Sequence, residues 1–121
     1  MSGKKSRTKG HSYERAIANV FREAGYTDAK RQLEYQEGLG VDLANTGPYR
    51  VQCKRYKAYA PITKIEEVPE EVGTVPLLIT KADNKPDMVC LSLNHFIELV
   101  KDRRKLVDIY TESRKDYKED K

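Results

Sequence analysis

Residues 40–54 read GVDLANTGPYRVQCK, and the fold is predicted chiefly from this segment. Apolar and polar residues alternate with a period of two over residues 41–44 and again over residues 49–54, which is typical of half-buried strands. The intervening segment, NTGP at residues 45–48, has the residue types of a tight turn. The stretch therefore predicts a β-hairpin with one apolar face and one polar face.

The polar face of this hairpin gathers groups that can do chemistry. Alternate residues of a strand share a face, so Asp42 lies opposite its apolar neighbours, and Gln52 and Lys54 lie opposite theirs. With the turn centred near Gly47, Asp42 and Gln52 are equally far from it and should sit across from each other. Lys54 follows two residues along the same face. We therefore expect these three polar groups to converge.

An amphipathic helix is predicted upstream, over residues 10–24. Its apolar residues recur at helical spacing, and Gly25 ends the pattern. These residues are Tyr13, Ala16, Ile17, Val20, Phe21 and Ala24. At about 100° per residue, Glu14 lies at the edge of the apolar stripe and not on the solvent side. We therefore expect the Glu14 carboxylate to face the sheet.

The remaining residue patterns predict a mixed α/β domain. We expect a short strand at residues 29–33, a short helix at 61–71, strands at 75–80 and 88–93, and a helix that begins at Asn94. The order of elements is then α-β-β-β-α-β-β-α. We divide the chain into a basic flexible arm at residues 1–8, one domain at 9–104, and a charged C-terminal extension at 105–121, partly helical or disordered.

Composition excludes several classes of protein. The chain has 121 residues, of which 35% are charged, and the mean hydropathy is -0.78, so a thin core should lie beneath a polar surface. No run approaches the roughly 20 apolar residues of a membrane helix, and no signal peptide is recognisable, so we expect an intracellular, cytoplasmic protein with no membrane partner. Cys53 and Cys90 lack metal-type spacing and should be reduced.

The distribution of charge favours a polyanionic partner. The formal net charge is +4 and the isoelectric point is about 9.0. One basic cluster precedes the first helix and a second follows the hairpin. They consist of Lys4, Lys5, Arg7 and Lys9, and of Arg50, Lys54, Arg55 and Lys57. Both clusters could contact phosphates, although a solvated tail and a solvated strand end explain them equally well.

The polar groups of the helix and hairpin suit a metal-assisted hydrolysis. Two carboxylates and an amide oxygen, from Glu14, Asp42 and Gln52, are hard ligands of the kind that Mg²⁺ or Mn²⁺ prefers. Lys54 could position a water or offset charge on a phosphate. Each residue also has a structural explanation: an ion pair on the helix surface for Glu14, a strand end for Asp42, and a solvated strand face for Gln52 and Lys54.

Three segments together resemble a known family. They are KGHSYER at residues 9–15, GVDL at 40–43 and QCK at 52–54. In this order they are similar to the PD-(D/E)xK nuclease superfamily, and specifically to the archaeal and phage type of Holliday-junction resolvase. The resemblance covers roughly residues 8–93 and implies a restriction-endonuclease-like fold, with a central mixed sheet flanked by helices.

The resemblance also implies an active site and a substrate. Its catalytic residues would be Glu14, Asp42, Gln52 and Lys54. Its metal ligands would be Asp42, Gln52, Glu14 and the carbonyl of Cys53, holding Mg²⁺ with Mn²⁺ able to substitute. A homodimer would make paired nicks in branched DNA during recombination or repair, associated with the nucleoid or encoded by a virus. We expect DNA contacts from Lys4, Lys5, Arg7, Lys9, Arg15, Arg55 and Lys57.

Gln52 departs from the family pattern, which has a carboxylate at this position. The amide removes one negative charge and should weaken cation binding, although its oxygen can still coordinate. Two alternatives therefore stay open: a nuclease of the same fold for another DNA structure, and a non-catalytic DNA-binding module. The combination of Glu14, Asp42 and Lys54 argues against the second.

Overall fold

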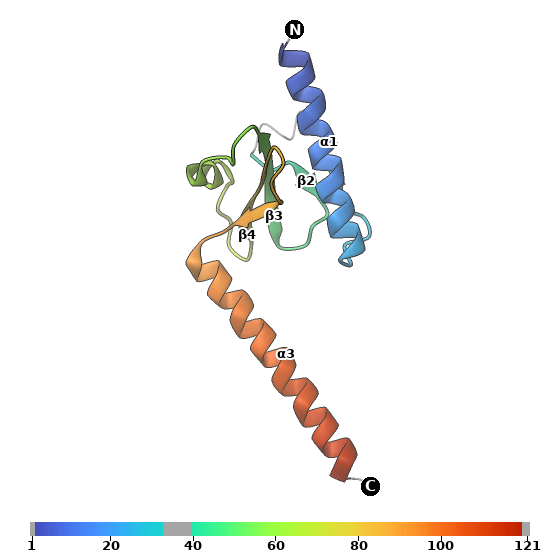
Figure 1. The fold of residues 1–121 in the computed structure, drawn as a ribbon. Helices are drawn as coiled ribbons and strands as arrows, with labels where there is room; N and C mark the ends of the chain where they lie inside the picture. Colours follow the sequence, from blue (N-terminus) through green and yellow to red (C-terminus); the bar gives the residue numbers. More distant parts are fainter. Residues whose placement is uncertain (1, 33–39, 120–121) are drawn as a thin grey trace. The chain divides into compact units, whose positions relative to one another are not determined.

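The computed structural model of the chain describes residues 2–32 and 40–119, with the side chains of residues 10–32 and 40–114. The elements of the first of two compact units, Met1–Leu91, are α1 (Ser2–Glu23), β1 (Lys30–Arg31), β2 (Leu43–Ala44), β3 (Tyr49–Tyr56), the 3-10 turn η1 (Ile62–Glu67), β4 (Val75–Ala82) and β5 (Met88–Cys90). The second unit, Ser92–Lys121, contains α3 (Leu93–Glu119). Figure 1 shows the ribbon.

The central sheet has the order β3-β4-β5 and is mixed, because β3 and β4 are parallel while β4 and β5 are antiparallel. A parallel pair needs a crossover connection, and η1 lies within it. The register places Gln52 beside Leu78 and Lys54 beside Thr80. Since β3 stands at one end of this order, one of its edges is available to other parts of the chain. The predicted order of elements and the mixed sheet are confirmed.

The predicted hairpin is wrong in its strand pairing. β2 pairs with β1, with Lys30 opposite Ala44 and Arg31 opposite Leu43. The segment before β2 contacts β3 differently: the Asp42 N–H donates to the Val51 carbonyl at 2.8 Å, and the Asp42 side chain accepts the Cys53 N–H. Because a carboxylate takes that N–H, it is not available to a regular antiparallel ladder.

Two boundaries also differ from the expected ones. α1 begins at Ser2 and not near residue 10, so residues 2–8, expected as a flexible arm, are helical. No proline interrupts these residues, and lysine, arginine and serine are all compatible with a helix. The division into units falls between Leu91 and Ser92, whereas we expected the domain to extend to residue 104. No helix in the described part of the chain is long and apolar enough to cross a membrane.

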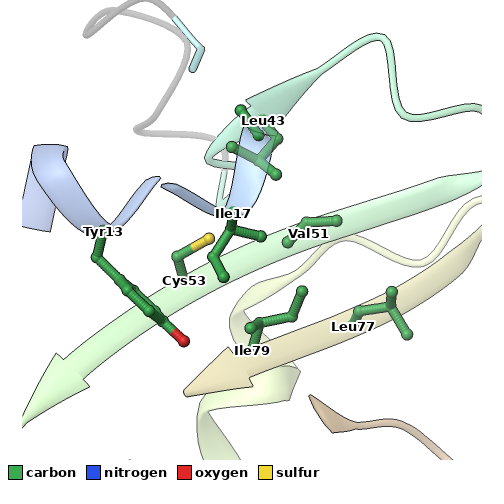
Figure 2. Close-up of a cluster of buried hydrophobic side chains, with 8 residues drawn as sticks. Tyr13, Ile17, Leu43, Val51, Cys53, Leu77 and Ile79 are labelled. Atoms are coloured by element: carbon green, nitrogen blue, oxygen red, sulfur yellow. The ribbon is translucent and has the colours of Figure 1, made fainter. Parts of the chain in front are cut away.

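The core of the first unit lies between α1 and one face of the sheet. Side chains from α1, β2, β3 and β4 form one buried cluster: Tyr13, Ile17, Ala18, Leu43, Val51, Cys53, Leu77 and Ile79. Figure 2 shows Val51 and Cys53 of β3 and Leu77 and Ile79 of β4 turned toward this cluster. Burial of this apolar surface holds α1 against β3. It therefore fixes the position of Glu14, a residue of α1, relative to β3.

Candidate active site

Asp42 is fastened to the edge of β3 by two hydrogen bonds. Its backbone N–H donates to the Val51 carbonyl at 2.8 Å, and its Oδ2 accepts the backbone N–H of Cys53 at 2.7 Å. Cys53 lies between Gln52 and Lys54 in the strand. The structure therefore brings the predicted aspartate to the residue that separates the two predicted polar groups of β3, although by a side-chain contact and not by a hairpin.

Gln52 and Lys54 meet at a common partner. Gln52 Nε2 donates to Glu67 Oε2 at 2.6 Å, and Lys54 Nζ lies 3.8 Å from the same oxygen. Gln52 is only 3% exposed, and its Oε1 is buried without a hydrogen bond from any described residue. A buried amide oxygen without a donor is costly unless something else engages it, and a hard divalent cation is one such group.

Glu67 is a site residue that the sequence reasoning missed. It ends η1, and its other oxygen, Oε1, lies 3.0 Å from Lys64 Nζ. The hydrogen bond from Lys64, followed by the one from Gln52, lowers the pKa of Glu67 below its ordinary value. The pattern Lys64-x-x-Glu67 indicates a helical ion pair. Nothing in the sequence separates Glu67 from the other acidic residues between positions 66 and 71 as a partner of Gln52.

Glu14 is buried at the sheet side of α1. The residue is 7% exposed, and its Oε2 lies 3.8 Å from Nη1 of Arg31, the last residue of β1. Electrostatics connects it to the rest of the site through Cys53. Burial raises the pKa of the Cys53 thiol well above its ordinary value, the charges of Asp42 and Glu14 raise it further, and Lys54 lowers it. Three of the four predicted catalytic side chains thus act on one thiol.

The candidate donors at this site are oxygen atoms, the kind of ligand that a hard divalent cation prefers. In the described part of the chain, no group of three or more histidine, cysteine, aspartate or glutamate side chains could hold a metal. A cation here must therefore use amide or backbone oxygens in addition to carboxylates. The Gln52 Oε1 atom, buried without a donor, supplies the first kind. The carbonyl of Cys53 stays a predicted ligand.

The predicted DNA-binding residues differ in how far they are accessible. Arg15 and Lys57 are exposed, whereas Arg55 is half-buried and its Nη2 lies 3.9 Å from Asp83 Oδ1. The side chains of Lys4, Lys5, Arg7 and Lys9 lie outside the described part of the chain, although their backbone belongs to α1. Residues 33–39, which form most of the loop before Gly40, also lie outside it.

Comparison with known proteins identifies the family. The family model Mrr_cat, described as restriction endonuclease, matches residues 6–82 of the 121. No curated protein and no solved structure matches the chain. The matched segment holds most of α1, the Asp42 segment, β3 and η1. It therefore contains Glu14, Asp42, Gln52, Lys54 and Glu67. The chain belongs to this restriction endonuclease family, within the PD-(D/E)xK superfamily.

Proposed function

We propose that this member of the restriction endonuclease family is a metal-dependent, structure-specific DNA endonuclease that resolves four-way junctions by paired nicks. DNA cleavage follows from the family. One observation carries the active site: Asp42 is bound to the backbone of Cys53, between Gln52 and Lys54. Support for a branched substrate comes from the resemblance of KGHSYER, residues 9–15, to the opening segment of the junction resolvases.

The side chains of the proposed active site are of two kinds: oxygen ligands for a metal ion, and the positively charged Lys54. Asp42, Glu14, the Oε1 of Gln52 and the carbonyl of Cys53 would hold Mg²⁺, with Mn²⁺ able to substitute. When bound, such an ion polarises a phosphate oxygen and lowers the pKa of a water, which supplies the nucleophile for phosphodiester hydrolysis. Lys54 brings a positive charge next to this set, where its ammonium orients the attacking water or offsets charge that develops on the phosphate.

The remaining basic residues would hold the DNA backbone. Arg15 and Lys57 are exposed on the unit that carries the site, and contacts from such side chains to phosphates increase affinity without reading sequence. We include Lys4, Lys5, Arg7, Lys9 and Arg55 in this set. Paired nicks in opposite strands require two sites, so the proposal includes a homodimer.

A gel assay tests the substrate. Purified protein is incubated with a synthetic four-way junction and with a linear duplex of matched sequence, each with Mg²⁺ and with EDTA. We expect paired nicks in the junction that need Mg²⁺, and little cleavage of the duplex. Equal cleavage of both substrates would replace the resolvase with a nuclease of broader substrate range. Tight binding without any cleavage would point to the non-catalytic module.

A further inference from the structure

Glu67 links the candidate site to the turn that precedes β4. Its Oε2 accepts the hydrogen bond from Gln52 Nε2 at 2.6 Å and lies 3.8 Å from Lys54 Nζ. Its Oε1 lies 3.0 Å from Lys64 Nζ within η1. One carboxylate therefore contacts both polar side chains of β3 with one oxygen, and a lysine of its own turn with the other.

This contact decides which end of the Gln52 amide faces Glu67. A carboxylate only accepts hydrogen bonds, so the end that faces it must be Nε2. Turning the amide by half a rotation would bring two acceptor oxygens together at the 2.6 Å that now separates donor and acceptor. It would also put N–H donors where Oε1 now lies. Glu67 thus leaves Oε1 as the buried atom without a donor among the described residues.

The orientation matters because position 52 holds an amide. The two oxygens of a carboxylate are equivalent, so either face of it attracts a cation. An amide attracts a cation only through its oxygen, whereas its N–H groups repel one. A glutamine at this position therefore needs a partner that fixes its orientation, and a carboxylate would not.

The fold holds Glu67 in place through Gly40. The φ angle of Gly40 is +82°, and a Cβ added there would lie 2.0 Å from the Glu67 carbonyl oxygen. Only glycine allows the backbone that leads to Asp42 to pack this closely against the end of η1. Val68, buried at 3% exposure, anchors the chain on the other side of Glu67. The segments that carry Asp42 and Glu67 are thus in direct backbone contact.

We propose that Glu67 is a positioning residue: it binds the amide nitrogen of Gln52, keeps Oε1 available to a divalent cation, and returns next to the site the negative charge that Gln52 lacks. This inference rests on the proposed metal-dependent function. Glu67 acts through Gln52 and belongs to no predicted ligand set. Partners of this kind typically contribute about 10- to 100-fold to the affinity of a site for its metal.

The test measures cation binding without DNA. Isothermal titration of the full chain with Mn²⁺ alone is compared between wild type, Glu67→Ala and Glu66→Ala, with circular dichroism to confirm folding. We expect Glu67→Ala to weaken Mn²⁺ binding about tenfold or more. Glu66→Ala removes an exposed acidic residue from the same turn and should leave the affinity unchanged. The Glu67 side chain is 44% exposed, so its removal should leave the fold intact.

An exchange of the two groups separates positioning from a structural role. The single variant Glu67→Gln loses both the charge and the fixed amide orientation, and should bind Mn²⁺ more weakly than wild type. Adding Gln52→Glu restores one carboxylate and one amide in a hydrogen bond, with the carboxylate now at position 52, and should restore the affinity or exceed it. The exchange leaves Lys64 without its carboxylate, so a merely structural ion pair would not be rescued.

The outcomes distinguish this proposal from the proposed function. Equal Mn²⁺ affinity in wild type and Glu67→Ala, or no recovery in the folded exchange variant, would overturn the positioning role alone. If wild-type protein binds Mn²⁺ with an affinity that falls in Glu67→Ala but cuts no DNA, the positioning role is supported and the proposed function is overturned. Wild-type protein that binds no Mn²⁺ would overturn both.

Discussion

The two faces of β3 are both largely removed from solvent, but by different forces. On one face, Val51 and Cys53 pack into the cluster between α1 and the sheet, where apolar burial supplies the free energy. On the other, Gln52 and Lys54 are held by a single carboxylate, that of Glu67. The first face places Glu14 over the sheet, and the second supplies the groups for chemistry. Stability and activity should therefore respond separately to changes one residue apart.

Among changes within β3, the largest effect should come from the polar face. Lys54→Met removes the ammonium that would orient water or offset charge, and we expect the single-turnover cleavage rate to fall about 100- to 1000-fold. Stability should change little, because Lys54 is only half-buried. The matched control is Lys85→Met, an exposed lysine in the turn between β4 and β5 that belongs to no proposed site, and it should cut within about threefold of wild type. A Lys54→Met protein that cuts at the wild-type rate would show that the chemistry lies elsewhere.

A side chain at Gly40 should destabilise the fold, because it would collide with the backbone of Glu67. In Gly40→Ala, the positive φ and the clash with the Glu67 carbonyl together should lower the free energy of unfolding by about 3 kcal/mol. Gly73→Ala is the matched control, because Gly73 has nearly the same φ, +81°, with open space around it. Urea unfolding of the two variants isolates the contact. Equal destabilisation would show that Gly40 does not hold η1 in place.

A change on the apolar face should affect stability and leave catalysis intact. Val51 is 0% exposed, and Val51→Ala should lower the free energy of unfolding by about 2 kcal/mol through lost burial and a residual cavity. Below the unfolding transition, the cleavage rate per folded molecule should match wild type. If cleavage instead falls while the unfolding curve stays in place, the two faces are not separable.

The smallest effect concerns acid stability. Hydrogen bonds from Lys64 and Gln52 hold the pKa of Glu67 below its ordinary 4.5, so the charged form stabilises the folded state above that pH. This contribution is lost as the pH falls below 4.5. Melting temperatures from about pH 6 to about pH 3 should decline less steeply for Glu67→Gln than for wild type or Glu66→Gln. Identical slopes would mean that Glu67 is not coupled to folding.

Local pattern predicted most of what the structure shows at this strand. The alternation in residues 49–54 correctly separated Val51 and Cys53 from Gln52 and Lys54, because a period of two follows from strand geometry. The helical stripe correctly placed Glu14 near the buried side of α1. The family match confirms the restriction-endonuclease-like fold. Such features depend on neighbours in the sequence, so the sequence reveals them.

The strand pairing and the role of Glu67 could not be predicted, because they depend on contacts between residues that are distant in the sequence. The turn residues at 45–48 predicted a hairpin between β2 and β3. In the structure β2 pairs with β1 instead, and the Cys53 N–H of β3 donates to the Asp42 side chain. Glu67 reaches Gln52 across fifteen residues, and no spacing rule marks it among its acidic neighbours. The catalytic roles of Glu14, Asp42, Gln52 and Lys54 stay predictions, because the structure gives the positions of these side chains and not what they do in a reaction.

The most direct test of the active site is cleavage of the four-way junction by Asp42→Asn, with junction binding measured in parallel by gel shift. An asparagine oxygen can still accept the Cys53 N–H, so the fold should persist while a charged ligand is lost. We predict that cleavage in Mg²⁺ falls at least about 1000-fold and that binding stays within about threefold of wild type. Cleavage at the wild-type rate by a folded Asp42→Asn protein would contradict the assignment of the active site to the edge of β3.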